Sequence, residues 1–353
     1  MFRVNFSGFQ KRLCDGGFKC SSSITFKRNI ADFLAYKNGL VKKVRAPGAH
    51  FDKLMIFARK YADCEMRYRR YPKRINIIEV GPTCGLDEKK KSLYKNIKVD
   101  FVNRLNETGL KNVQVVDFSR RFFSPNMKDG RYVNERLNEY IRPSDVVNSM
   151  IIPTIGTYNR EMFVNKNINE IVLNLGITDS YNRFISSEGK ESVFKSMEEI
   201  LLVARDDGLR VRGGVSGNMG GMTSENPAVD VMVECVERFD RMGVDCVDVV
   251  DTSVEGGSRV IFDIVDRCLN RDVSPSKMAV QIRDNEVDGL LKVAEFLDRG
   301  IVNYRTCLMG LETGILSTEK LINFCKRNEI DFGDVDINKL LQTSFWVNRF
   351  FKF

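Results

Sequence analysis

Carboxylate side chains stand at the ends of β-rich segments of this 353-residue chain, where they could do chemistry. Asp251 ends the segment DCVDVVD, and Asp284 lies two residues after the segment KMAVQI. Carboxylate oxygens are ligands that Mg²⁺ prefers, so the two acids could hold a magnesium ion. An aspartate before a helix also stabilises the free N–H groups of the first turn, and we favour this capping interpretation.

Histidine is missing from the part of the chain where an enzyme would use it. The only histidine, His50, precedes the first β-rich segment. This excludes a Ser–His–Asp or His–Cys nucleophile, a histidine base and a two-histidine metal site from the residues that follow. The glycine-rich segment RGGVSGNMGGM (212–222) matches neither the dinucleotide fingerprint nor the P-loop, so its glycines indicate an unusual turn.

β-rich segments and amphipathic helices alternate strictly through most of the chain. The predicted strands cover residues 75–81, 113–118, 147–154, 170–176, 209–216, 245–251, 277–282 and 302–309. The predicted helices cover residues 96–109, 130–141, 158–166, 190–208, 226–242, 257–270, 286–300 and 317–328. Strict alternation requires a parallel sheet, and eight units favour closure into a barrel. We therefore predict an α/β fold, a (β/α)8 TIM barrel over residues 75–330.

The active site of such a barrel forms at the carboxyl ends of its strands. The candidate residues there are Thr83, Cys84, Asp117, Thr154, Gly176, Ser216, Asp251, Thr252, Asp284 and Met309. The nine cysteines include no CxxC pair, which favours small buried apolar residues over a disulfide framework or a zinc ribbon. No run approaches the roughly 18 uncharged apolar residues of a membrane span.

Charge divides the chain into a basic extension and an acidic remainder. The net charge is +8, and residues 1–74 carry 18 Lys/Arg against 5 Asp/Glu, which leaves 37 against 42 for residues 75–353. Residues 1–30 are rich in basic and hydroxyl side chains, with Asp15 their only acid. This composition is typical of a mitochondrial transit peptide, with a basic arm as the alternative. We expect the protein in the mitochondrial matrix.

Residues 31–74 are predicted to form a helical basic extension. Its last part interleaves tyrosines with Arg67, Arg69, Arg70, Lys73 and Arg74. Such a patch could contact RNA or another acidic partner, although a solvated face is the commoner arrangement. The end of the chain, residues 331–353, is predicted to be a short helical tail. Its aromatic sequence SFWVNRFFKF indicates packing on the barrel or on a partner.

Five segments together resemble the 3-hydroxy-3-methylglutaryl-CoA lyase family of the DRE-TIM metallolyases. They are IIEVGPTCGLDEKK (77–90), FFSPNM (122–127), LRVRGGVSGNMG (209–220), VVDTSVEGG (249–257) and AVQIRDNEVDGL (279–290). No segment is specific alone, but all five occur in the family's order over residues 75–330. The resemblance implies a barrel that binds a divalent metal and cleaves a carbon–carbon bond.

The chain departs from the family at the positions that the resemblance assigns to chemistry. The family's catalytic arginine and metal-binding aspartate stand here as Thr83 and Cys84, and its two metal-binding histidines stand as Gln281 and Arg283. The family's glycine-rich loop, with its reactive cysteine and the following metal-binding asparagine, is missing between MGLETG and ILSTEKL (309–321). The family residues that remain are Arg212, Asp251, Thr252 and Asp284.

These departures predict an inactive relative without a metal or other cofactor. We expect it to be retained as a structural or binding subunit of a mitochondrial assembly or as a homodimer. The alternative is an active lyase or aldolase-type enzyme that acts on a CoA ester or a keto acid. It would use Asp251, Asp284 or Arg212, with Mg²⁺ or Mn²⁺ held in a manner foreign to the family.

Overall fold

The structure is a computed structural model. It describes residues 71–86, 93–120, 124–162, 167–217, 226–252, 260–284, 289–311 and 314–350. The predicted transit peptide, most of the predicted helical extension, and Arg67, Arg69 and Arg70 of the basic patch lie outside these ranges.

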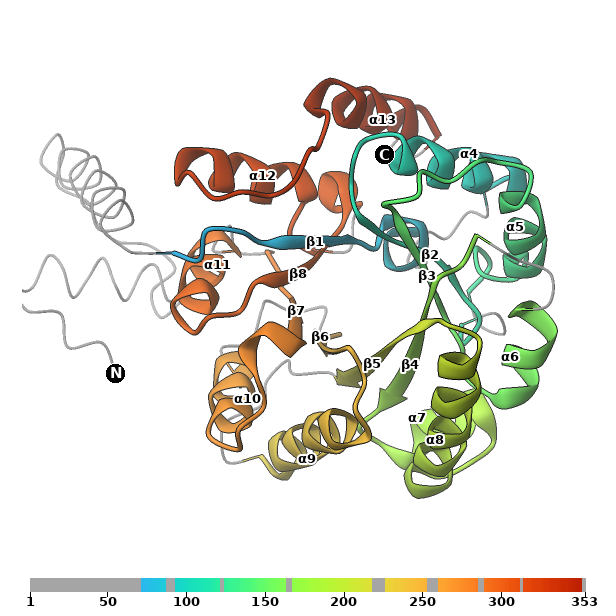
Figure 1. The fold of residues 1–353 in the computed structure, drawn as a ribbon, viewed down its shortest axis with the longest axis vertical. Coiled ribbons are helices and arrows are strands. Elements are labelled where there is room, and N and C mark those ends of the chain that lie inside the picture. The colour runs from blue at the N-terminus through green and yellow to red at the C-terminus, as the bar shows by residue number, and fades with distance from the viewer. Residues whose placement is uncertain are drawn as a thin grey trace, which may run out of the picture. The chain divides into compact units, whose positions relative to one another are not determined.

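Eight parallel strands close into a barrel in the order of the sequence (Figure 1). They are β1 (Asn76–Glu79), β2 (Asn112–Asp117), β3 (Val147–Ile151), β4 (Glu170–Gly176), β5 (Arg210–Gly217), β6 (Cys246–Asp251), β7 (Met278–Gln281) and β8 (Asn303–Thr306). The barrel closes where β1 pairs with β8, with Asn76 opposite Asn303 and Glu79 opposite Thr306. The predicted (β/α)8 barrel is confirmed.

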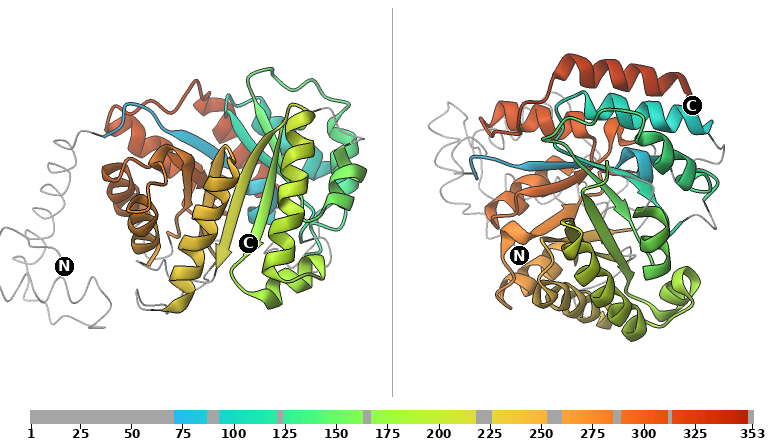
Figure 2. Two further views of the ribbon diagram at one scale, coloured as in Figure 1. Left: turned by 60° about the horizontal axis from the view of Figure 1, so that its bottom comes forward. Right: turned by 45° about the vertical axis from the view of Figure 1, so that its right-hand side comes forward.

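Helices surround the strands on the outside, as the side view in Figure 2 shows. They are α4 (Lys95–Asn106), α5 (Gly130–Leu137), α6 (Ile155–Met162), α7 (Asp179–Ser186), α8 (Lys190–Asp206), α9 (Pro227–Met242), α10 (Val260–Leu269), α11 (Gly289–Asp298), α12 (Thr318–Arg327) and α13 (Ile337–Phe350). Every residue of β6 is buried, as expected for a parallel strand covered on both faces.

Three elements at the strand ends were not predicted from the sequence: the π-helix η1 (Gly81–Gly85), the helix α7 and the 3-10 helix η3 (Leu308–Gly310). The only buried residue of α7 is Asn182. Its amide accepts a hydrogen bond from the Gly176 nitrogen at 2.9 Å and donates one to the Gly176 oxygen at 2.8 Å. The helix therefore docks on the end of β4 through a polar side chain, and its apolar residues Tyr181, Phe184 and Ile185 are not buried.

The predicted C-terminal tail is the helix α13, which packs on α4 (Figure 1). The backbone nitrogen of Asp336 donates to the oxygen of Thr108 at 2.7 Å, and the Ser344 hydroxyl donates to Glu319 of α12 at 2.7 Å. Leu340 is buried in this contact, whereas Phe345 is 70% exposed. The tail thus packs on α4 and α12 of the outer ring and presents aromatic surface of its own.

The sequence predicts neither a membrane span nor a disulfide framework, and the described residues bear on both predictions. None of the helices in the described ranges combines the length and the apolar character that crossing a membrane requires. The cysteines in those ranges are free thiols: Cys84, Cys235, Cys246, Cys268, Cys307 and Cys325. All of them except Cys84 are buried, which agrees with their prediction as small core residues.

Candidate functional site at the barrel mouth

Two arginines and two acids form a charged cluster inside the barrel. The Nε atom of Arg212 lies 3.3 Å from Oε1 of Glu170 and 3.6 Å from Oδ2 of Asp248. Arg305 of β8 donates from Nη1 to the same Asp248 oxygen. Each of the four side chains is at most 4% exposed. Burying a charge costs several kcal/mol unless it is paired, and here two positive charges balance two negative ones.

The guanidinium of Arg305 also reaches the residues at the barrel mouth. Its Nη1 and Nε atoms donate to Oε1 of Gln114 and Oε1 of Gln281, each at 3.2 Å. Its Nη2 atom lies 3.9 Å from the sulfur of Cys84. Thr83 joins the network because its hydroxyl accepts from Gln114 at 2.6 Å. The structure therefore gathers three of the predicted site residues around an arginine that the sequence analysis did not single out.

This arrangement does not fit a divalent cation. Gln281 and Cys84 stand where the resemblance places a metal-binding histidine and aspartate, and both contact the Arg305 guanidinium. A positive charge at 4 Å opposes each unit of ion charge by about 4 kcal/mol at an effective dielectric constant near 20. Within the described ranges, no group of three or more His, Cys, Asp or Glu side chains could hold a metal ion.

Of the two acids considered as magnesium ligands, Asp284 uses its carboxylate for other contacts. Asp284 accepts a hydrogen bond from the nitrogen of Gly289, the first residue of α11, at 2.8 Å, and it pairs with Lys320 at 2.5 Å. It therefore acts as a helix cap. Asp251 is buried at the end of β6, and its backbone oxygen accepts from the Nε atom of Arg283 at 3.2 Å. The next residue, Thr252, donates its backbone nitrogen to Gly217 at 2.9 Å.

The short connection after β8 lies along the end of β7. Asp284 donates its backbone nitrogen to the oxygen of Gly314 at 2.6 Å, and Leu316 donates to Ile282 at 2.9 Å. Arg283, opposite Ile315 in this pairing, is 6% exposed. The predicted loss of a glycine-rich loop thus corresponds to a connection that pairs with the barrel end and leaves Arg283 buried.

Glu79, the last residue of β1, ties that strand to the β8–α12 connection. Its Oε1 atom accepts from the backbone nitrogens of Gly81 and Leu308 at 2.8 and 2.9 Å, and its Oε2 atom accepts from the Thr318 hydroxyl at 2.5 Å. Burial raises the pKa of Glu79 to about 7 because these hydrogen bonds only partly offset the loss of hydration. Burial likewise raises the pKa of Asp117 to about 6.

Arg212, expected as a remnant of the site at the mouth, lies toward the other end of the barrel. It is the third residue of β5, and five more residues of that strand follow before its carboxyl end. The side chain lines a hollow of about 260 Å³ at the amino ends of the strands, together with Lys111, Arg210 and Arg74. The exposed Arg74, one of the predicted basic residues, lies 3.6 Å from Asp331.

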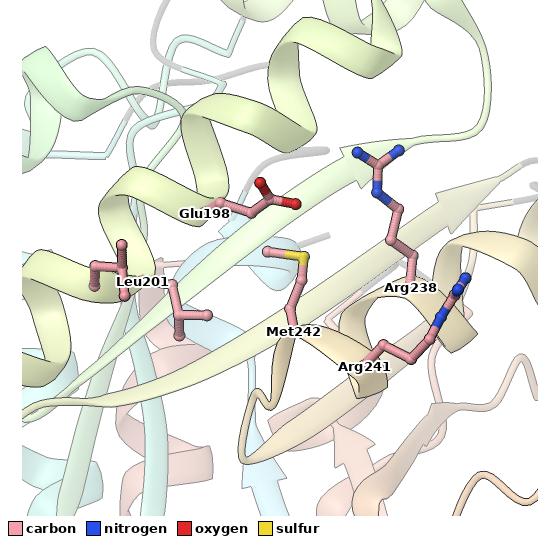
Figure 3. Close-up of a pocket in the computed structure, with 6 residues that line it drawn as sticks. Glu198, Leu201, Arg238, Arg241 and Met242 are labelled. Atoms are coloured by element: carbon pink, nitrogen blue, oxygen red, sulfur yellow. The ribbon is translucent and has the colours of Figure 1, made fainter.

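A second hollow lies on the outer ring, away from the strand ends. It occupies about 430 Å³ between α8 and α9 (Figure 3). Its lining consists of Glu198, Leu201, Leu202, Arg238, Arg241 and Met242. All of these residues belong to the two outer helices, so the groove shares no lining residue with the charged cluster inside the barrel.

The strand order and the strand-end residues define a TIM barrel with an arginine-centred network at its mouth. No protein-family profile matches the chain. The cytoplasmic 3-hydroxy-3-methylglutaryl-CoA lyase of Rattus norvegicus is 23% identical over 287 residues, which cover 78% of this chain and 81% of that protein. A hydroxymethylglutaryl-CoA lyase of Bacillus subtilis is 20% identical over 287 residues, which cover 79% of this chain and 94% of that protein.

Solved structures show the same fold. The Bacillus subtilis HMG-CoA lyase matches with a TM-score of 0.71 and 19% identity, covering 80% of this chain and 95% of that one. An Acinetobacter baumannii HMG-CoA lyase, solved with coenzyme A and 3-methylmalate, matches with a TM-score of 0.68 and 21% identity, covering 79% of this chain and 92% of that one. The chain is therefore similar to the hydroxymethylglutaryl-CoA lyases in sequence and in fold, and the resemblance predicted from its motifs is confirmed.

Proposed function

We propose that this lyase homologue does not carry out metal-dependent carbon–carbon cleavage and serves as a structural or binding subunit of a mitochondrial assembly. The observation that carries the proposal is the buried guanidinium of Arg305 against Gln281 and Cys84. A divalent ion polarises a substrate carbonyl only if its ligands can replace its hydration shell. The donors at this mouth already bind a permanent cation instead.

Two features support a role as a subunit. The first is the charge contrast between residues 1–74 and the acidic remainder of the chain, because a basic arm favours an acidic protein or RNA as partner. The second is α13, whose Leu341, Phe345 and Phe350 are 42%, 70% and 41% exposed. Exposed apolar side chains on one terminal helix favour a protein contact, with a heterologous partner or with a second copy of the chain.

The mitochondrial location rests on the composition of residues 1–30, which is basic and almost free of acids. Relatives of the chain include lyases named mitochondrial, such as that of Macaca fascicularis, and lyases named cytoplasmic, such as that of Rattus norvegicus. The transit-peptide composition favours the mitochondrial alternative. Imaging a C-terminally tagged full chain in the native organism tests it, and a cytosolic signal would contradict it.

The alternative, an enzyme that acts on a CoA ester or a keto acid, would need Asp251, Asp284 or Arg212 to meet a substrate. Asp284 caps α11 and binds Lys320, and Arg212 is buried against Glu170 toward the amino-terminal end of the barrel. These internal contacts favour the non-catalytic proposal.

Metal content and turnover of the purified full chain test the proposal. We expect no stoichiometric Mg²⁺, Mn²⁺ or Zn²⁺ by mass spectrometry, and no cleavage of hydroxymethylglutaryl-CoA with added Mg²⁺ or Mn²⁺. The Bacillus subtilis lyase, assayed in parallel, is the positive control. Turnover that a chelator abolishes would overturn the proposal. Tight 1:1 binding of a CoA ester, measured by calorimetry, would favour the alternative enzyme.

A further inference from the structure

The contacts of Arg305 are distributed in the way that ligands surround a bound cation. The guanidinium meets a carboxylate of β6, the amide oxygens of Gln114 on β2 and Gln281 on β7, and the sulfur of Cys84 in η1. These partners belong to four different elements around the barrel. Every one of them offers a lone pair, as the ligands of a metal ion do.

Asp248 depends on Arg305 for most of its charge pairing. Without Arg305, Asp248 would share Arg212 with Glu170, which also pairs with the half-exposed Arg210 at 3.5 Å. Oδ1 of Asp248 is buried and has no hydrogen-bond partner among the described residues. The buried carboxylate of Asp248 would then lose one of its two charged partners, which is costly for a buried group.

We propose that Arg305 is a built-in cation of the barrel, and that its removal would open a cation-binding site lined by Asp248, Gln114, Gln281 and Cys84. The native chain would exclude a divalent ion because the guanidinium already fills this site. This inference goes beyond the proposed function. It concerns the cation site that Arg305 fills at the barrel mouth, and it would hold even if the chain had a metal-independent activity.

The occupant of the opened site follows from the chemistry of its lining. One carboxylate and two amide oxygens suit a hard divalent ion, and the thiol of Cys84 adds a softer donor that Mn²⁺ tolerates better than Mg²⁺ does. A planar guanidinium from solution also fits, because it would restore the native hydrogen bonds to Asp248 and Gln281. Cys84 is the partly exposed member of the set, so an added cation would enter from its side.

Cation rescue of the variant Arg305→Ala tests the proposal. Thermal unfolding of the full chain is followed by circular dichroism with and without millimolar Mn²⁺ or methylguanidinium. We expect either cation to raise the Tm of the R305A variant by about 2–4 °C relative to its effect on the native chain, since a ligand that binds only the folded state stabilises it. Calorimetry should detect one Mn²⁺ site in the R305A variant and none in the native chain.

The double variant R305A with Asp248→Asn is the matched control. It keeps the cavity but removes the carboxylate, so neither cation should stabilise it. If the R305A variant does not fold unaided, its refolded yield with and without methylguanidinium becomes the measurement, and a higher yield with the cation supports the proposal. The proposal is overturned if a cation changes the Tm of the R305A variant no more than that of the native chain, or no more than that of the double variant. It is also overturned if the refolded yield does not depend on the cation. Turnover of the native chain is measured separately, so this inference and the proposed function can fail independently.

Discussion

Arg212 and Arg210 contact the same carboxylate, that of Glu170, at very different depths. The Arg212 side chain is 2% exposed and lies 3.3 Å from the Glu170 carboxylate, whereas the Arg210 side chain is 51% exposed and lies 3.5 Å from it. Removing one partner of a buried pair leaves an uncompensated charge, so we expect Arg212→Met to lower the free energy of unfolding by roughly 3–5 kcal/mol. The matched change Arg210→Met should cost less than about 1 kcal/mol. Urea unfolding of both variants measures the difference, and equal losses would contradict this account of the interior.

Glu79 makes stability depend on pH. Its folded pKa, raised to about 7 by burial, lies above the unfolded value near 4.5, so the folded state binds the extra proton. The contribution of Glu79 to stability is therefore fully present below the unfolded pKa and is lost as pH rises from about 4.5 to 7. Glu79→Gln keeps an oxygen acceptor for Gly81 and Leu308 but cannot ionise, and it should flatten this fall. Measuring the free energy of unfolding at closely spaced pH values tests this prediction, and the Asp117→Asn variant tests a second buried acid in the same way. An unchanged slope of the unfolding free energy against pH in the Glu79→Gln chain would contradict it.

The strand-end residues could be predicted from the sequence, whereas the network that holds them could not. Thr83 and Cys84 follow an apolar run, and position after a strand was enough to name them, whereas Gln281 was named only from the family resemblance. Arg305 and Asp248 lie inside β8 and β6. Whether such residues meet depends on barrel closure and on which residues point inward, which a single sequence does not specify. The available signal was a charged residue inside a predicted strand, Asp248 within CVDVVD and Arg305 within NYRT.

Among the elements, α13 offers two neighbouring leucines with opposite surroundings. Leu340 is 1% exposed and Leu341 is 42% exposed. We expect Leu340→Ala to cost about 2–5 kcal/mol, because it removes buried methyl groups and leaves a cavity. Leu341→Ala should change stability by less than about 1 kcal/mol. Urea denaturation of the two variants tests whether α13 is part of the folded barrel; similar small effects would mean that the helix does not stabilise it.

Elements with an apolar stripe were predicted well, and those held by polar contacts were not. The stripe of α8 includes Val193, Met197, Ile200 and Ala204, all buried, and its predicted and observed bounds differ only at the end of the helix. In contrast, η1 is only five residues long, and α7 buries none of its apolar residues. They form because the chain must turn sharply at the mouth and satisfy its backbone groups there, as Asn182 does for Gly176.

At the scale of the whole molecule, the separation of charge yields a prediction about assembly. Salt shortens the range of exposed charges from about 10 Å at 0.1 M to about 3 Å at 1 M. In extracts of the native organism at low salt, we expect the full chain to sediment with a body larger than its own 40.4 kDa, and to separate from it at high salt. Glutamine substitutions at five residues should release it at low salt: Arg67, Arg69, Arg70, Lys73 and Arg74.

A charge-matched control places five glutamines on exposed positions of the barrel. They replace Arg131, Arg136, Arg210, Arg271 and Lys277. This variant loses the same charge, so its continued sedimentation with the larger body would locate the contact in the basic extension. Release by ribonuclease would identify RNA as the acidic partner, and resistance to it would favour a protein. A native chain that sediments at its own mass at low salt would contradict the assembly, and equal release of the two variants would show that only net charge matters.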